Sequence, residues 1–386
     1  MKILGIETSC DETAVAVVES TGDIRSPSFK LLAEALYSQV ETHAKYGGVF
    51  PAMAKREHAK NLVPLLRKVL DSLTPSPVKE KGLGDEAVGN LKQILDREPG
   101  LFEMTKDLLE TVEKPDIDLI AVTAGPGLEP ALWVGINFAR ALSEAWNIPL
   151  IASNHMEGHI VSPLIDSEHR VEFPALALLI SGGHTELVHI KDWTEYEVIG
   201  RTRDDAVGEA FDKVARLLSL PYPGGPEISK LAEEGRQRNV VPRFALPRPM
   251  IHTKDYDFSF SGIKTSVLYT LKKIDDITPE IKTEMALEFE NAVTEVLVTK
   301  TRKALEEFGA KTLILGGGVV ANTYIRQEFQ KLIEQHSETK LLIPDIKLST
   351  DNAVMIAAAG YLNFLKNKNS DIELRAQGNL SLGARK

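Results

Sequence analysis

The chain of 386 residues contains one cysteine and no long apolar run. A single cysteine excludes a disulfide framework and favours a reducing compartment. The longest clean apolar run is ALALLI, from Ala175 to Ile180, which is far short of the roughly eighteen residues that a membrane span needs. The chain opens directly into KILGIE, without a charged leader or an Arg-rich amphipathic stretch. We therefore expect a cytoplasmic globular protein without a membrane segment.

The sequence also lacks an excess of positive charge, since its formal net charge is −10. This balance argues against a broad nucleic-acid-binding face, but it leaves a local basic groove or a basic partner subunit open. With 43% hydrophobic residues, a chain of this length can bury a full core and is expected to form two domains.

Strand and helix patterns alternate along the chain in two similar halves. In the first half, KILGIET and TAVAVVES predict a strand–turn–strand, which precedes a helix over Pro51–Leu73 that carries His58. In the second half, FPALALLIS and ELVHIK predict another strand–turn–strand, and helical patterns and the strand TLILGGG follow it. This repetition predicts a duplicated α/β unit with a ligand cleft between the halves.

Two segments do not fit the periodic pattern. Residues 72–115 are charged and interrupted by Pro and Gly, which predicts a surface insertion with one or two helices. Residues 235–257 contain three prolines and five basic residues, so they predict a stiff, basic loop that contacts phosphate. A solvated connector is the alternative interpretation of this loop. Its basic residues are Arg236, Arg238, Arg243, Arg248 and Lys254.

The stretch NHMEGH places His155 and His159 four residues apart, so on a helix both imidazoles share one face and can reach one ion. The zinc-protease motif H-E-x-x-H has its general base directly after the first histidine. Here Glu157 comes two residues after His155 and points away from the helix face that carries the histidines. It is therefore not placed to act as the general base of a protease. Two histidines need a third ligand from elsewhere. A pair of surface or capping histidines is the alternative.

Three glycine turns, SGGHT, YPGGPE and GGGVVAN, lie beside expected strand ends or helix starts. Such turns let backbone N–H groups approach an anion closely. None matches G-x-x-x-x-G-K-[ST], which excludes a P-loop, and none forms G-x-G-x-x-G in a Rossmann setting. All three lie in the second half of the chain, so we expect them to bind phosphate there.

Ten motifs in one order resemble the tRNA threonylcarbamoyladenosine transferase family over the whole chain apart from the insertion. They are GIETSCDET, TAGPGL, NHMEGH, SGGHTEL, DDAVGEAFDKVARLL, YPGGP, PRPM, DFSFSGIKTS, LGGGVVAN and STDNAVMIAAAG. The resemblance implies a duplicated α/β fold of the actin/Hsp70/sugar-kinase type, with two subdomains and the active site between them. The expected first subdomain spans residues 1–153 and 352–386, with the insertion at about 72–115. The second spans 154–351 and carries most of the metal and nucleotide site.

The resemblance further implies an acyltransferase that takes threonylcarbamoyl-AMP and modifies the adenosine beside the anticodon, in tRNAs that read codons beginning with A. The implied metal ligands are His155, His159 and Asp351, which would hold one Fe(II) or Zn(II) ion per chain. The implied substrate-binding residues are Leu179, Ile180, Ser181, Gly182, Gly183, Asp212, Gly225 and Asn322, with Asp212 on the ribose hydroxyls. The implied partners are tRNA, a paralogous subunit of the same fold and a small ATPase, as in bacterial members.

Attack by the adenosine amine releases a proton, and Asp11 and Glu12 are the candidates for the base that accepts it. Three other functions were weighed. In a metalloprotease (glycoprotein endopeptidase) the general base would have to be Glu157, which is not on the ligand face. A sugar kinase needs no histidine pair. A non-catalytic scaffold subunit needs no metal ligands.

Overall fold

The computed structural model describes residues 1–73, 83–367 and 374–383, which form two compact units. Unit 1 comprises Met1–Arg170 and Asp351–Lys386, and unit 2 comprises Val171–Thr350. Unit 1 is therefore built from two separate pieces of chain, and unit 2 is inserted between them. Residues 74–82 of the predicted insertion, and 368–373 and 384–386 of the predicted first subdomain, lie outside the described residues.

Residues 154–170 were expected in the second subdomain but belong to unit 1. They include α6 (His155–Val161), which follows β5 (Leu150–Asn154) directly and contacts α12 (Ala353–Asn367), β4 (Leu119–Gly125) and β5. The histidine pair is therefore held by the first unit.

Unit 1 contains a five-stranded mixed sheet in the order β3-β2-β1-β4-β5. Its strands are β1 (Lys2–Glu7), β2 (Glu12–Thr21), β3 (Ser28–Ser38), β4 (Leu119–Gly125) and β5 (Leu150–Asn154). Its helices are α1 (Val40–Ala44), α2 (Pro51–Leu73), α3 (Asp85–Ile94), α4 (Pro99–Thr111), α5 (Glu129–Trp146), α6 (His155–Val161) and α12 (Ala353–Asn367). The helices α3 and α4 lie in the predicted insertion.

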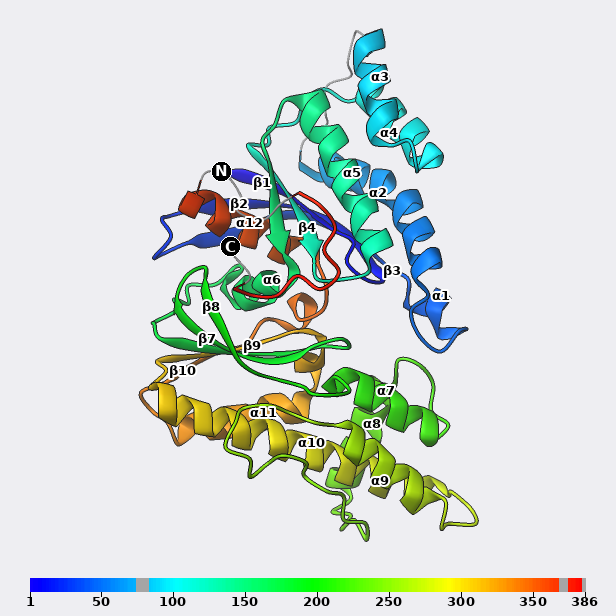
Figure 1. The fold of residues 1–386 in the computed structure, drawn as a ribbon, viewed down its shortest axis with the longest axis vertical. Coiled ribbons are helices and arrows are strands. Elements are labelled where there is room, and N and C mark those ends of the chain that lie inside the picture. Colours follow the sequence, from blue (N-terminus) through cyan, green and yellow to red (C-terminus); the bar gives the residue numbers. More distant parts are fainter. Residues whose placement is uncertain (74–82, 368–373, 384–386) are drawn as a thin grey trace. The chain divides into compact units, whose positions relative to one another are not determined.

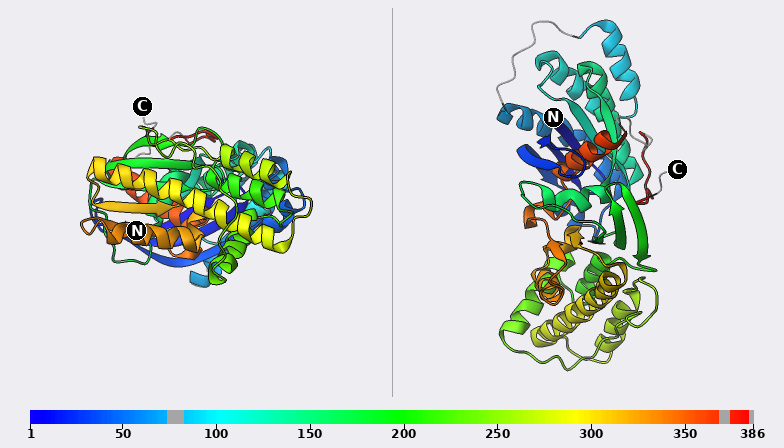
Figure 2. Two further views of the ribbon diagram at one scale, coloured as in Figure 1. Left: turned by 90° about the horizontal axis from the view of Figure 1, so that it is seen from below. Right: turned by 90° about the vertical axis from the view of Figure 1, so that its left-hand side faces the viewer.

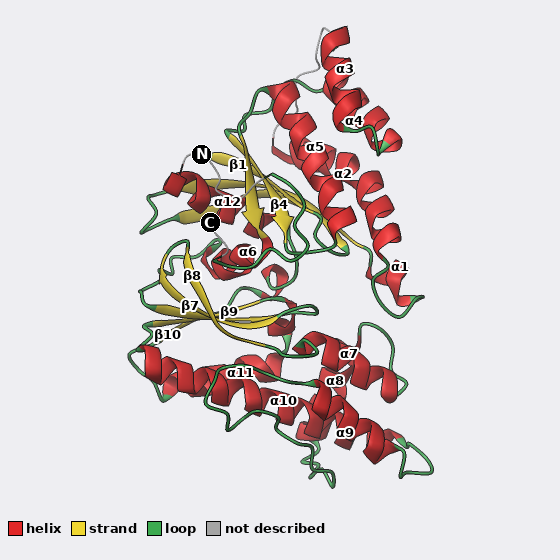
Figure 3. Ribbon diagram, viewed as in Figure 1, coloured by secondary structure: helices red, strands yellow, loops and turns green. Residues whose placement is uncertain are grey.

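Alternate side chains of the buried strands of unit 1 point to opposite faces of its sheet. Leu4 and Ile6 of β1 join the apolar cluster beneath α2 and α5, while Gly5 faces α12. Figures 1 and 3 show α2 and α5 on one face of this sheet, and α12 stays beside the β1 and β2 strands in the side view of Figure 2. The sheet is thus covered by helices on both faces, which explains why its central strands β1 and β4 are mostly apolar.

Unit 2 repeats the same topology, with the sheet order β10-β9-β6-β7-β8. Its strands are β6 (Ala175–Ile180), β7 (Thr185–Asp192), β8 (Glu195–Arg201), β9 (Thr312–Gly316) and β10 (Lys340–Leu342). Its helices are α7 (Val207–Leu217), α8 (Gly224–Gln237), α9 (Ser261–Leu271), α10 (Pro279–Phe308) and α11 (Thr323–Glu334). The short 3-10 turns are η1 (Ser162–Leu164) in unit 1, and η2 (Gly318–Ala321) and η3 (Ile346–Leu348) in unit 2.

The duplication is visible in strand direction. In each unit the first strand pairs antiparallel with the second and parallel with the fourth, the second pairs antiparallel with the third, and the fourth pairs parallel with the fifth. The strand order therefore reads 3-2-1-4-5 in both units. This confirms the predicted duplicated α/β fold of the actin/Hsp70/sugar-kinase type. Among the residues described, no helix is long and apolar enough to cross a membrane.

Candidate metal centre and nucleotide-binding residues

The two histidines lie at the start of a helix that directly follows a strand. β5 ends at Asn154, whose side-chain oxygen accepts hydrogen bonds from Met156 N at 2.8 Å and Glu157 N at 3.4 Å. This cap starts α6 at His155. One helical turn then places His155 and His159 on the same face, with ring centroids 4.7 Å apart. The helical spacing predicted from the sequence is confirmed.

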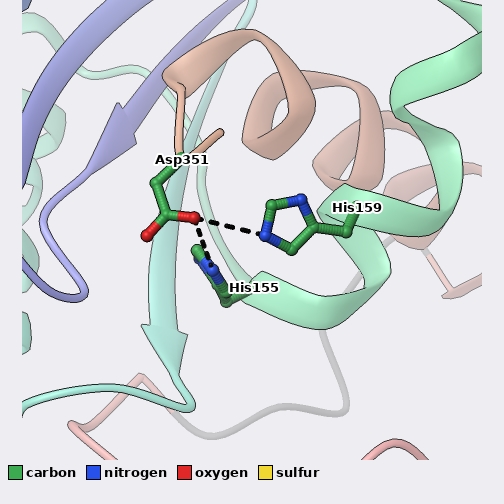
Figure 4. Close-up of side chains that lie close together, drawn as sticks. All are labelled: His155, His159 and Asp351. Atoms are coloured by element: carbon green, nitrogen blue, oxygen red, sulfur yellow. Dashed lines mark ion pairs between the residues drawn. The ribbon is translucent and has the colours of Figure 1, made fainter. Parts of the chain in front are cut away.

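Asp351 completes this group from the point where the chain re-enters unit 1, just before α12. Its Oδ1 lies 3.2 Å from Nε2 of His155 and 3.2 Å from Nε2 of His159 (Figure 4). One ligand atom from each of the three residues lies within 4.8 Å of the others, so the group can hold a metal ion.

The surroundings of His159 fit an ion better than they fit a hydrogen-bonded histidine. Its ring is fully buried, and neither ring nitrogen makes a hydrogen bond, although Nε2 lies 3.2 Å from Asp351 Oδ1. A buried polar atom without a partner is costly. Donors about 2.0–2.1 Å from one tetrahedral ion lie about 3.3 Å apart, close to the 3.2 Å found here.

Glu7, at the end of β1, supports His155 from the side opposite Asp351. Its Oε2 lies 3.2 Å from His155 Nδ1 and accepts a hydrogen bond from Thr123 Oγ1 at 2.5 Å, while its Oε1 accepts one from Ser9 N at 2.5 Å. A carboxylate on the far nitrogen of a ligating histidine fixes its tautomer and orientation. No role for Glu7 was predicted from the sequence. The available signal was a carboxylate that ends the apolar strand KILGIE.

The charges of the group depend on burial and on each other. Burial acts to raise the pKa of Asp351, but His155 and then His159 outweigh it and hold this pKa far below its ordinary value. Burial acts to lower the pKa of His155, but Asp351 and Glu7 raise it well above its usual range. For His159 burial wins, and its pKa is lowered. Without an ion, a proton on His155 therefore balances the carboxylates, and a bound cation would compete with that proton.

The candidate bases are Asp11, in the turn before β2, and Glu12, the first residue of β2, and both are partly buried. Burial, followed by the charges of Asp11 and Asp351, raises the pKa of Glu12 to about 10. The hydroxyl of Ser38 donates to Glu12 Oε1 at 3.2 Å. At neutral pH Glu12 is thus a neutral acid in the metal-free protein.

Glu157 is turned away from the metal group, as its position in the helix predicts. The side chain is buried, and its Oε2 accepts a hydrogen bond from Asn363 Nδ2 of α12 at 2.8 Å. It is therefore tied to a neighbouring helix and cannot act as a protease base beside the histidines.

The first glycine turn in unit 2 follows the buried end of β6, where Leu179 and Ile180 are fully buried. Ser181 Oγ accepts hydrogen bonds from Gly183 N at 3.3 Å and His184 N at 3.1 Å, which shapes the turn. A side-chain carbon added at Gly182 or Gly183 would meet no atom within 4 Å. A ligand can therefore approach the backbone of this turn. That these residues bind substrate stays a prediction.

The other predicted substrate residues already have partners within unit 2. Asp212 Oδ1 accepts a hydrogen bond from Gly224 N at 2.7 Å, at the first residue of α8. Asn322 caps α11 by accepting from Ile325 N at 2.9 Å, and its Nδ2 donates to Ser229 Oγ at 2.7 Å and Glu290 Oε1 at 2.6 Å. Gly225, by contrast, has open space around it. Any contact of Asp212 or Asn322 with a nucleotide would add to these bonds or replace them.

Three arginines of residues 235–257 pair with acidic residues of α10: Arg236 lies in the last turn of α8, and Arg243 and Arg248 lie in the loop after it. The three ion pairs at 2.5–2.6 Å are Arg236 with Glu290, Arg243 with Glu284, and Arg248 with Glu288. These contacts fasten the loop to the helix and neutralise much of the positive charge that was expected to contact phosphate. They favour the alternative interpretation, a structural connector.

Comparison with known proteins identifies the family of this chain. The family model described as tRNA N6-adenosine threonylcarbamoyltransferase matches residues 30–79 and 101–358, and so leaves the stretch with α3 unmatched. A protein of that name from Thermosipho africanus is 43% identical over 99% of this chain and 100% of its own length. One from Bacillus subtilis is 41% identical over 99% of this chain and 96% of its own length.

Among solved structures, full-length HypF in its phosphate- and nucleotide-bound form is similar with a TM-score of 0.50. It is 13% identical, and the match covers 71% of this chain and 43% of HypF. At that identity the likeness concerns the fold alone. The full-length identity to the two transferases, together with the family model, shows that this chain belongs to the tRNA N6-adenosine threonylcarbamoyltransferase family.

Proposed function

We propose that this chain transfers the threonylcarbamoyl group from threonylcarbamoyl-AMP to the exocyclic amine of the adenosine beside the anticodon of tRNA. Its full-length relatives are named for transfer to N6 of adenosine in tRNA. The observation that carries the proposal is that this family member keeps the His155–His159–Asp351 group with its ligand atoms close together. A scaffold subunit would have no use for such a buried group.

We propose one Fe(II) or Zn(II) ion per chain as the metal. Two imidazoles and one carboxylate suit either ion and leave positions for other ligands. When bound, such an ion would act as a Lewis acid on the carbonyl of the group being transferred. The protein fixes the donors: Glu7 orients His155, and the Asn154 cap sets where α6 begins.

The glycine turns of unit 2 are the proposed holders of the nucleotide. Leu179, Ile180, Ser181, Gly182 and Gly183 end β6 and form the first turn. The residues proposed after it are Asp212, Gly225 and Asn322. The open space at Gly183 and Gly225 supports this role, because backbone N–H groups there can be reached by a phosphate. The transfer depends mainly on the orientation of the substrate, since a carbamoyl-adenylate already carries a good leaving group.

The reaction makes one bond and breaks one. The adenosine nitrogen bonds to the carbamoyl carbon, the bond from that carbon to the phosphate oxygen breaks, and AMP leaves with its electron pair. The nitrogen loses a proton, which needs an acceptor. We propose Asp11 and Glu12 as the candidate acceptors, because they come from the turn after β1 and the first residue of β2.

Partner subunits complete the proposal. We propose that a paralogous subunit of the same fold and a small ATPase assist the reaction. The net charge of −10 supports this, and so do the ion pairs that occupy three of the five basic residues of the 235–257 segment. A partner can supply positive charge for a tRNA backbone.

The test is transfer of labelled threonylcarbamoyl from its adenylate to tRNA, with and without the partner subunits. We expect label on tRNA with the wild-type chain and none with His159→Ala. If no label is transferred to tRNA when the wild-type chain and every partner subunit are present, the proposal is overturned. Cleavage of a glycoprotein by the same preparation, abolished by His159→Ala, would instead support the protease function.

A further inference from the structure

The turn between β1 and β2 is held by its backbone carbonyl groups. Three consecutive carbonyls each accept a hydrogen bond from a different part of unit 1: the start of α5, helix α2, and the residue that follows β3. The bonds are Leu128 N to Ser9 O at 2.7 Å, His58 Nε2 to Cys10 O at 3.0 Å, and Gln39 N to Asp11 O at 3.0 Å. Because the donors come from separate elements, the turn keeps its shape only while all of them stay in place.

His58 is the one side-chain donor among these three. It is fully buried on α2, and its Nδ1 faces two donors, Thr13 Oγ1 at 2.8 Å and Gln39 Nε2 at 3.4 Å. Nδ1 therefore accepts, and the ring proton sits on Nε2, where it points at the Cys10 carbonyl. Burial lowers the pKa of His58 to about 4, which keeps this neutral tautomer at physiological pH.

The turn carries groups that lie beside the metal centre. Ser9 Oγ is 3.2 Å from His155 Nδ1, and Asp11 and Glu12 are the acidic residues that follow Cys10. A change in the direction of the Cys10 carbonyl rotates the peptide that joins it to Asp11. We infer that His58 is a positioning residue, which fixes the Cys10–Glu12 turn through the Cys10 carbonyl and so sets where Asp11 points. The consequence for catalysis rests on the proposed function.

The chain contains its own probe of this turn, because Cys10 is its single cysteine. The thiol is partly buried, and burial together with the neighbouring acidic groups raises its pKa. The Cys10 thiol should therefore react slowly with a reagent such as dithiobis(nitrobenzoate) while these hydrogen bonds hold the turn in place. Loosening the turn exposes the thiol and speeds the reaction, whether or not the protein is turning over substrate.

Two substitutions at His58 separate its two contacts. In His58→Gln the side-chain amide nitrogen can reach the place of Nε2 and still donate to the Cys10 carbonyl. In His58→Asn the shorter amide reaches only the place of Nδ1, so the bond to Cys10 is lost although the residue stays polar. The matched control is His189→Asn on β7: His189 is another buried histidine, and its ion-pair partner is Glu197 of β8 in unit 2, not a residue of the turn.

We expect His58→Asn to speed the Cys10 reaction about tenfold or more and to lower kcat for transfer by a similar factor, with KM for tRNA within about twofold. His58→Gln should stay near wild type in both the thiol rate and kcat, and His189→Asn should leave the thiol rate unchanged. Bound metal should be equal in all four proteins.

Equal thiol rates in His58→Asn and His58→Gln would overturn the inference. A faster thiol with unchanged kcat would show that the turn is held by His58 but that its position does not matter for transfer, which also overturns the positioning role. If the wild-type chain transfers nothing, the proposed function fails, and the thiol rates still decide whether His58 holds the turn.

Discussion

His159 lies wholly inside unit 1 with neither ring nitrogen hydrogen-bonded, and its Nε2 faces the carboxylate of Asp351. At the scale of single residues, this environment is expensive for an imidazole alone and natural for one that ligates an ion. The neighbouring His155 differs, because its Nδ1 contacts the carboxylate of Glu7. One histidine is therefore oriented by a carboxylate, and the other by the packing around it.

His159→Ala should reduce metal affinity at least about a hundredfold, because two ligands cannot close a stable site. Elemental analysis of the purified proteins should find about one equivalent of transition metal in the wild type and almost none in the variant. The matched control is His189→Ala on β7, another buried histidine without hydrogen-bond partners, which should retain the full amount. Equal metal in wild type and His159→Ala would refute the ligand assignment.

Glu7→Gln should weaken metal binding about 10–100-fold, since an amide supports the His155 ring less well than a carboxylate does. Competition with a chelator of known affinity measures this change. Glu157→Gln provides the comparison, because Glu157 is equally buried on α6 but contacts Asn363. We expect it to keep wild-type affinity. If the two variants lose the same affinity, Glu7 has no special role at His155.

At the scale of elements, the metal group depends on how closely α6 and α12 approach. Gly158, between the two histidines, packs against α12: a side-chain carbon there would lie 2.9 Å from Met355 Cγ and 3.2 Å from Ile356 Cδ1. Asp351 directly precedes α12, so any widening of this contact moves one ligand away from the other two.

Gly158→Ala should therefore destabilise the protein by about 1–3 kcal/mol through overpacking and weaken metal binding at the same time. Gly89→Ala is the control, because Gly89 lies inside α3 with open space around it. That variant should gain about 0.5–1 kcal/mol, since alanine favours a helix over glycine. Thermal unfolding and metal titration of both variants check this. A stable Gly158→Ala protein with normal metal affinity would show that the contact can adjust.

Periodic elements were predictable from the sequence, and elements fixed by the rest of the fold were less so. The helix α2 was predicted with its observed bounds, Pro51–Leu73, although Pro64 lies inside it, because its apolar residues recur at helical spacing over many turns. The half-exposed strands β3 and β8 and the 30-residue helix α10 were not singled out. In β3 and β8 the adjacent apolar pairs Leu31–Leu32 and Val198–Ile199 break the alternation. The helix α10 buries glutamates that pair with a distant loop.

The same difference holds for the site. His155, His159 and Asp351 were placed through a whole-chain resemblance, because Asp351 comes from nearly two hundred residues away and no local spacing could identify it. The partners of Asp212 and Asn322 could not be foreseen, because Gly224 and Glu290 reach them only in the folded unit 2. Nor could the support that Glu7 and His58 provide, since both act across strands and helices that meet only after folding.

At the scale of the whole molecule, the stability of the fold depends on pH through buried histidine. The pKa of His58 is about 4 in the folded protein, below the ordinary value of 6.5. Between these values the unfolded chain binds the proton and the folded chain does not, so this contribution is complete above about pH 6.5 and is lost as pH falls toward 4. It amounts to about 3 kcal/mol.

The free energy of unfolding of wild type should therefore fall more steeply between pH 6.5 and 4 than that of His58→Gln, which has no titrating group at this position. Denaturant unfolding across this range measures the difference, and other ionisable groups cancel in the comparison. Parallel curves for the two proteins would mean that His58 titrates normally.

The insertion of unit 2 between Arg170 and Asp351 also orders events during synthesis. The ribosome makes His155 and His159 early, then the whole of unit 2, and only afterwards Asp351 and the helix α12 that packs on β1, β2, β4 and β5. Unit 2 can thus fold while unit 1 still lacks its last layer. Nascent chains arrested at Thr350 should take up no iron or zinc, whereas released chains should, so metal loading is a late step of biogenesis.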